Sequence, residues 1–479
     1  MVATLFHVLY LLSAWAGTTY LHSTLWERND ELSNILKQEV IELTRDLTTV
    51  ESMTAFIACV SELSLYGDFT EPSLPHVIDL LEQNKFAPES NSFEGENFRL
   101  VFVRYFTVIG PPALTPLMKI VKNTELLTET RELASESIRQ IAQTAGVKST
   151  DTATEIENIL MSEWDRSGNS LICTRLLNSY GYIAENSEAS QIFLIELLER
   201  DDISVKIPAI EAACESQRGS ARILLALAQE FQKCNKPETR RGSPLLYTII
   251  DSYGKLGLFD ESIDAFLKLE IETNDDPIWR IMCAESLART RTDSATFRHR
   301  TLSELQHEMS IRPVSPNGCI VVNKALHVLH TWDPQHLIEA EQLLIEVVQE
   351  PSVDSLRAFA FELLLKMQST SVHRLVEGFS ESTCDGLRLE GIFYRSKNSE
   401  IDMDDLRFLS ELLSDEYAAD SLRLECIRIF ATAESKALVF QDQLEKLWQG
   451  PGPAEIRIHS LAAYNKIRSS TTKPLPKDP

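Results

Sequence analysis

Glycine, proline and closely spaced cysteines are scarce in this 479-residue sequence, and each shortage excludes a class of structure. With 17 glycines and 19 prolines, the chain has few tight turns of the kind that join β-hairpins, and it is not collagen-like or of low complexity. The nearest two of its eight cysteines are Cys214 and Cys234, so no CxxC or zinc-type spacing occurs. The composition is that of a folded chain with ample apolar residues for a core.

Positive charge is also in short supply. There are 46 lysines and arginines against 71 aspartates and glutamates, which gives a net charge of −25. The field of such a chain repels polyanions instead of releasing their counterions. We therefore expect no nucleic-acid partner, and we expect the partner to be another protein that is basic or carries a basic segment.

The usual signatures of catalysis are missing. The sequence contains no GxSxG, HExxH, GxxxxGK[ST] or GxGxxG motif, so it shows no nucleophile elbow, zinc helix, P-loop or dinucleotide loop. The acidic cluster of Glu400, Asp402, Asp404 and Asp405 lacks the central glycine and final glutamate of a calcium loop, and it predicts an N-terminal helix cap instead. We predict that the protein is not an enzyme and has no catalytic, cofactor-binding or metal-binding residues.

The first 26 residues form an apolar segment without a lysine, an arginine or an acidic side chain. Ala14-Trp15-Ala16 has the form of a signal-peptide cleavage site, so residues 1–26 are either a signal or anchor, or a buried first helix. The missing positive charge at the start favours the buried helix. The expected location is cytoplasmic, and export or membrane anchoring through residues 1–26 remains the alternative.

Apolar residues three and four apart run through most of the chain, as in Leu114, Leu117 and Val121. This period predicts amphipathic helices, and no sustained period-two pattern indicates strands, so we expect an all-α fold. After residues 1–26 we expect an N-terminal helical cap at 27–94 and a repeat region at 95–468. The tail at 469–479 has no apolar periodicity and is expected to be disordered.

One motif recurs along the chain: a basic residue, a small residue three positions later, and usually a larger apolar residue four beyond that. Its members are Arg131 and Ala134, Lys206 and Ala209, Arg280 and Cys283, Arg357 and Ala360, Arg388 and Gly391, Arg423 and Cys426, and Arg457 and Ser460. Looser copies begin at residues 99, 170, 241 and 322. The mean step of about 36 residues predicts a right-handed α-solenoid of about eleven stacked helical hairpins.

The small and basic positions each have an expected structural role. A small residue lets neighbouring helices approach closely, so Cys283 and Cys426 are interpreted as packing residues and not as nucleophiles. The basic residue follows an acidic turn in three copies, as Lys206 follows Asp202. We therefore predict a ladder of ion pairs that sets the register of the repeats; its rungs are Asp202–Lys206, Asp276–Arg280 and Asp354–Arg357. Trp279, next to Arg280, is expected in the core.

Three blocks of the sequence, 108–142, 179–214 and 252–288, carry a helix ended by glycine, a leucine-rich or isoleucine-rich helix, a polar turn and the motif. These blocks resemble HEAT repeats, and the resemblance spans residues 95–468. The period is shorter than the 40 to 47 residues of large HEAT arrays, and "YGKLGLFDESIDAFLKL" makes tetratricopeptide-like repeats the second choice. The resemblance implies an armadillo-like solenoid whose second helices line a groove that holds another protein.

We therefore predict a non-catalytic scaffold or adaptor for protein binding. The alternatives are a cofactor-attachment factor similar to the HEAT-like bilin lyases, which would need a reactive thiol or acid–base pair, and a membrane-anchored adaptor. One cationic cluster departs from the overall charge: Arg289, Arg291, Arg298 and Arg300 fall within residues 289–300. It is either a solvated connection between helices or a candidate partner-binding patch for an acidic group.

Overall fold

The computed structural model is built from α-helices and short 3-10 helices throughout the part of the chain that it describes. The described residues are 30–49, 53–64, 66–83, 93–146, 148–167, 171–235, 243–290, 295–311, 313–379, 385–398, 400–415, 418, 420–449 and 454–472. Contacts between Cα atoms divide the chain into two units. We call residues 50–64 and 71–356 the central unit, and residues 1–49, 65–70 and 357–479 the terminal unit. Residues 1–26, expected to be a buried helix or a signal, lie outside the described residues.

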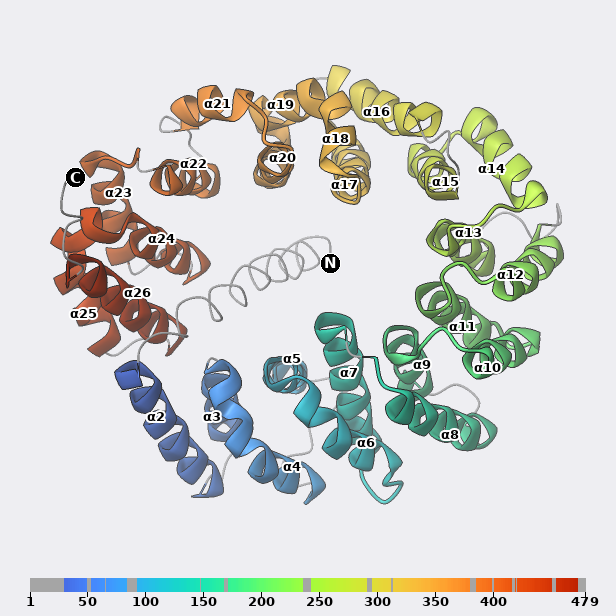
Figure 1. Ribbon diagram of the computed structural model, residues 1–479, viewed down its shortest axis with the longest axis horizontal. Helices are drawn as coiled ribbons and strands as arrows, with labels where there is room; N and C mark the ends of the chain where they lie inside the picture. Colours follow the sequence, from blue (N-terminus) through green and yellow to red (C-terminus); the bar gives the residue numbers. More distant parts are fainter. Residues whose placement is uncertain are drawn as a thin grey trace, which may run out of the picture. The chain divides into compact units, whose positions relative to one another are not determined.

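The central unit is a solenoid of helical hairpins arranged in two rows (Figure 1). The inner row comprises α5 (Phe93–Ile109), α7 (Thr128–Ala145), α9 (Leu171–Ile183), α11 (Ile203–Ser216), α13 (Pro244–Leu256), α15 (Pro277–Thr290) and α17 (Pro316–His330). The outer row comprises α4 (Leu74–Glu82), α6 (Leu114–Lys122), α8 (Thr150–Ser167), α10 (Glu188–Glu199), α12 (Ala221–Cys234), α14 (Glu261–Thr273), α16 (Ala295–Ser310) and α19 (Glu341–Gln349). The helix α3 (Met53–Leu63) packs against α5 at the start. The short α18 (Pro334–Leu337) lies between α17 and α19.

The terminal unit repeats the same plan with its own core. It contains α2 (Asp30–Thr49) and, after α20 (Asp354–Lys366), the helices α21 (Ser371–Phe379), α22 (Asp385–Lys397), α23 (Met403–Ser414), α24 (Asp420–Ala433), α25 (Gln441–Gln449) and α26 (Ala454–Thr472). Here α22, α24 and α26 pack side by side, and α21, α23 and α25 each pack on the following helix. Leu409, Phe430 and Ile467 belong to this core. The helix α26 continues to Thr472, so the first residues of the tail expected at 469–479 are helical.

Side-chain caps start many of these helices. Ser187, Asp202, Ser220, Ser243 and Asp260 each accept a hydrogen bond from a backbone N–H of the first turn of the helix that follows. Such caps satisfy N–H groups that have no partner inside the helix.

The acidic cluster at 400–405 is a cap as well. Asp402 accepts hydrogen bonds from the backbone N–H groups of Asp404 and Asp405 at the start of α23, and Asp405 completes a capping box. The cluster therefore starts a helix, as predicted.

The predicted repeat is confirmed helix by helix. Each of the eleven copies of the motif begins inside a different helix or at most three residues before one. These helices are α5, α7, α9, α11, α13, α15, α17, α20, α22, α24 and α26. The small residues of the motif lie buried between helices: Ala134, Ala209, Cys283, Ala360, Gly391, Cys426 and Ser460. A pattern with a mean step of about 36 residues therefore marks one helix per hairpin, as stacking of units that cannot bury their apolar faces alone requires.

Two inner-row glycines show how closely the helices approach. A Cβ atom on Gly181 of α9 would lie 2.9 Å from the Cα of Ala212 in α11. A Cβ on Gly254 of α13 would lie 2.9 Å from the Cα of Ser286 in α15. The atom met in each case is backbone, which cannot move without shifting a helix. These contacts fix the spacing between successive hairpins.

We predict that Gly181→Ala and Gly254→Ala each lower the free energy of unfolding by about 1–3 kcal/mol, because the added methyl overpacks a backbone contact. Urea unfolding followed by circular dichroism measures the change. Gly378→Ala in α21 is the matched control, since its Cβ would meet nothing within 4 Å and should be neutral or slightly stabilising. Equal stability of all three variants would contradict the close approach.

Candidate protein-binding surface

Lys206 and Arg280 do not form ion pairs with the acidic turn that precedes them, so the predicted rungs Asp202–Lys206 and Asp276–Arg280 were wrong, and the rung Asp354–Arg357 stays a prediction. Asp202 accepts hydrogen bonds from the backbone N–H and hydroxyl of Ser204. Asp276 accepts one from the backbone N–H of Ile278. Both carboxylates are occupied as helix caps, which is the favoured use of an aspartate directly before a helix. The side chain of Asp354 lies outside the described residues.

Lys206 and Arg280 instead reach forward to the next outer helix. The Nζ of Lys206 lies 2.5 Å from an Oε of Glu230 in α12, and both side chains are about 5–6% exposed. Arg280 holds Glu304 in α16 by two parallel bonds of 2.8 and 2.7 Å. In both cases the glutamate stands 24 residues after the cation. The same ion pair thus recurs two repeats apart and ties an inner helix to the following hairpin.

Other members of the motif reach an outer helix by different chemistry. Arg131 donates from Nε to the carbonyl oxygen of Val121 at 2.8 Å. The guanidinium of Arg388 lies 3.5 Å from the centre of the Phe408 ring. Arg457 donates from Nε to the backbone oxygen of Trp448. The basic position therefore anchors an inner helix to the outer row, and it does not form a uniform ladder.

The predicted cationic cluster does not stand free. Arg289 and Arg300 each pair with a glutamate of their own helix. Arg298 is buried, with its guanidinium 5.9 Å from the centre of the Trp332 ring. Arg291 lies outside the described residues. The structure thus engages three of the four arginines within the fold, and the partner-binding role given to them stays a prediction.

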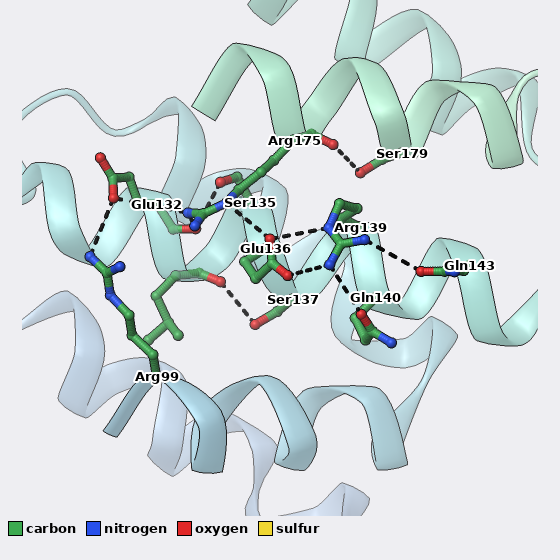
Figure 2. A network of polar contacts seen from close by, with 11 residues as sticks. Arg99, Glu132, Ser135, Glu136, Ser137, Arg139, Gln140, Gln143, Arg175 and Ser179 are labelled. Carbon is green, nitrogen blue, oxygen red and sulfur yellow. Dashed lines mark hydrogen bonds and ion pairs between the residues drawn. The ribbon is translucent and has the colours of Figure 1, made fainter. Parts of the chain in front are cut away.

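At one end of the inner row the exposed charges are balanced. Glu132 of α7 lies between Arg99 of α5 and Arg175 of α9, at 3.4 and 3.9 Å. Glu136 forms ion pairs with Arg175 at 2.9 Å and with Arg139 at 2.5 Å (Figure 2). Arg175 also donates to the backbone oxygen of Glu132. These side chains satisfy one another across three neighbouring helices and leave little charge for a partner.

Acidic groups predominate further along the same row. Glu211 of α11 and Asp251 of α13 face one cation, Lys255, whose Nζ is 3.6 Å from Asp251. Burial raises the pKa of Glu211; Lys255 opposes the shift and Asp251 adds to it. Asp276, at the start of α15, is exposed. Asp276 also interacts with Arg280, but the guanidinium of Arg280 is held by Glu304, so the carboxylates make this the negative part of the inner row.

Two aromatic side chains lie among these carboxylates. Tyr247 of α13 is 47% exposed, and its ring centre is 5.9 Å from that of Trp279 in α15. Burial raises the pKa of Tyr247, and nearby Asp251 and Asp276 add to the shift. Trp279 is only partly buried, contrary to its expected core position, and its Nε1 donates to Glu270 at 2.7 Å. We call Glu211, Tyr247, Asp251, Asp276 and Trp279 the inner patch.

The described cysteines give no sign of an activated thiol. Burial raises the pKa of Cys214 to about 12 and also raises the pKa of Cys283, which lies fully buried at its motif position. A nucleophilic thiol requires the opposite shift. Cys384 lies outside the described residues. Within the part of the chain that the structure describes, no group of three or more His, Cys, Asp or Glu side chains is placed to hold a metal ion.

No family model matches the sequence, and no curated protein matches it either. Solved structures align with it at low identity, and three of them illustrate this. They are an engineered protein (14% identity, 90% of this chain and 98% of that chain, TM-score 0.27), Kap95 in its complex with Nup1 (11%, 96% and 69%, 0.39), and a structure concerning the cadherin and beta-catenin interaction (10%, 89% and 100%, 0.27). Because these TM-scores are low, the solenoid is assigned from the packing of this chain's own helices.

Among the described residues, no single helix has both the length and the apolar composition needed to cross a membrane; only the pair Phe98–Ile109 and Pro111–Lys122 meets these criteria jointly, and it is bent by 114°.

Neither the glutamate partners of Lys206 and Arg280 nor the inner patch was predicted from the sequence. The two ion pairs have a signal in the sequence, because Glu230 follows Lys206 by 24 residues, as Glu304 follows Arg280. The inner patch had none, because its members come from three helices and share no motif.

A titrating carboxylate lies between the helices of the terminal unit. Burial raises the pKa of Glu390 in α22 to about 7; Glu425 adds to this shift and Arg428 opposes it. The guanidinium of Arg428 lies 3.7 Å from the centre of the Phe393 ring, and the ammonium of Lys397 lies 4.2 Å from it. Both nearby cations are thus partly engaged with an aromatic ring.

We predict that removing the Lys206 side-chain charge exposes the cost of burying Glu230. Lys206→Met should lower the free energy of unfolding by about 3 kcal/mol, because it leaves a buried carboxylate with only the exposed Lys233 as its partner. The double variant Lys206→Met/Glu230→Leu should recover most of this loss. Arg222→Met, which breaks the exposed Arg222–Glu188 pair, should cost less than about 1 kcal/mol in the same denaturation assay. Equal effects of the two single variants would contradict the buried pair.

We predict that Glu390→Gln stabilises the protein in a pH-dependent way. Because the folded pKa is raised from 4.5 to about 7, the folded state binds more protons in this window, and stability falls as pH rises through it. The variant should gain up to about 3 kcal/mol at pH 8 and about 1 kcal/mol at pH 5.5. Urea unfolding at both pH values measures the gain, and Glu411→Gln, which removes an exposed carboxylate, is the control. A gain that does not depend on pH would contradict the raised pKa.

Proposed function

We propose that this chain is a HEAT-type scaffold that binds another protein, and that the inner patch receives a basic segment of that partner. The observation that carries the proposal is the composition of the patch. Asp251 and Asp276 lie near the half-exposed Tyr247, Glu211 lies near Asp251, and the indole of Trp279 donates to Glu270. Tryptophan and tyrosine are enriched among the residues that dominate binding energy at protein interfaces.

A lysine or arginine side chain suits this patch in two ways. Its cation can lie over the face of Tyr247 or Trp279, an interaction of about 0.5–2 kcal/mol. It can at the same time donate hydrogen bonds to Asp251 or Asp276, and such charge-assisted bonds are stronger than neutral ones. The net charge of −25 adds long-range attraction for a basic partner and raises its association rate.

The neighbouring surface of the inner row supports specificity. On the side of α7 and α9, Arg99, Glu132, Glu136, Arg139 and Arg175 are bound to one another, and a partner's charge there would have to break existing pairs. The preference for positive charge is therefore confined to the patch on α11, α13 and the start of α15. A partner segment is expected to place its basic residues there and its neutral residues over α7 and α9.

We predict that neutralising the inner patch removes the partner. The variant Glu211→Gln/Asp251→Asn/Asp276→Asn keeps side-chain shape and the α15 cap, and should weaken capture of the partner from native extract by about tenfold or more. Tyr247→Ala should act in the same direction. Affinity capture with quantitative mass spectrometry, washed at low and at high salt, measures the loss.

The control removes three exposed carboxylates elsewhere on the central unit, as Glu125→Gln/Asp151→Asn/Glu261→Gln. It should retain the partner, and high salt should release the partner from the unmodified protein. A partner held equally by both triple variants, or one whose capture resists salt, would contradict the proposed site.

A further inference from the structure

A second exposed surface lies in the outer row, where α10 and α12 enclose an open groove of about 360 Å³. Ile192 and Ile195 of α10 and Leu225 and Ala226 of α12 form its apolar floor. We call this the outer groove. It is built only from the outer faces of two neighbouring hairpins and shares no residue with the inner patch.

The apolar floor is not part of the core. The core faces of the two helices are already formed by other residues, such as Leu194 and Leu197 of α10 and Leu227 of α12, which are buried. Ile192 is nevertheless 46% exposed and Leu225 is 62% exposed. Each helix thus carries a second apolar strip directed at the groove. Adjacent exposed apolar side chains of this kind are typical of interaction sites.

The charges of the outer groove are arranged unevenly along its length. At the start of the two helices, Arg222 pairs with Glu188 at 2.9 Å. Towards the ends, Glu196 and Glu199 line the groove and form no ion pair within the described residues. The carboxyl end of α10 adds partial negative charge at the same place. Lys233, the cation of the last turn of α12, is held by Glu230. One end of the groove is therefore neutral and the other negative.

We propose that the outer groove binds a short basic amphipathic segment of another protein. Two apolar side chains of this segment, three or four residues apart, pack on Ile192 and Leu225. Its lysine or arginine residues then lie at the end of the groove that carries Glu196 and Glu199. A helix that presents apolar residues at such spacing is a common way to fill a groove between two helices.

The probe for this site is a fluorescein-labelled synthetic peptide with leucines at positions i and i+4 followed by a run of lysines, titrated with the full chain by fluorescence anisotropy. We expect a Kd on the order of 10 µM at low salt. Leu225→Glu should weaken binding about tenfold or more, and Glu196→Lys/Glu199→Lys should do the same and reduce the salt dependence. Leu269→Glu is the matched control, because Leu269 is a 49% exposed leucine of α14 outside the groove, and it should leave binding unchanged.

Several results would overturn the assignment. These are no binding to the unmodified chain, equal loss with Leu269→Glu, and equal binding of a peptide whose leucines are replaced by serines. A dimer in analytical ultracentrifugation that Leu225→Glu dissociates would assign the groove to a second copy of the chain instead. The inner-patch triple variant should bind the peptide normally. If that variant alone loses the peptide, the peptide occupies the inner patch, and the outer-groove proposal fails while the proposed function stands.

Discussion

The close approach of successive inner helices is the constraint on which the rest of the central unit depends. Gly181 lies against the backbone of Ala212, and Gly254 lies against the backbone of Ser286. At these two points no side chain larger than hydrogen fits without a shift of a helix, so the glycines set how far apart successive inner helices lie. The spacing of the hairpins in turn decides which side chains of neighbouring inner helices can reach one another.

The two rows differ in what this packing leaves exposed. In the inner row, crowding brings charged side chains of three helices within ion-pair distance, as Glu132 and Glu136 show with Arg175. In the outer row, α10 and α12 have only a narrow contact, and a groove with an apolar floor remains between them. A repeat built this way presents a mainly polar surface in the inner row and, between α10 and α12, a partly apolar one in the outer row.

The sequence predicted the architecture because a small residue in a helix contact has a local signature. Ala209, Cys283 and Cys426 stand at a fixed distance from a basic residue, and all three are buried where helices meet. The partner of the basic residue could not be found in the same way, because Lys206 and Arg280 pair with a glutamate of the next helix, 24 residues later, whereas the nearby aspartates serve as caps. The inner patch is still less visible, since Tyr247 meets Trp279, and Asp251 comes near Glu211, only after three helices have stacked.

The same ion pairs affect which charged groups are exposed to a partner. Lys206 is 6% exposed and Arg298 is 8% exposed, so the fold withdraws these cations from the surface together with the groups that hold them. Burying an unpaired charge is costly, so carboxylates without a cation tend to remain at the surface. The surface available to a partner thus keeps the acidic excess of the whole chain, which has 71 acidic and 46 basic residues. Glu196, Glu199, Asp251 and Asp276 are local instances of this excess, and both proposed sites place positive charge of a partner against them.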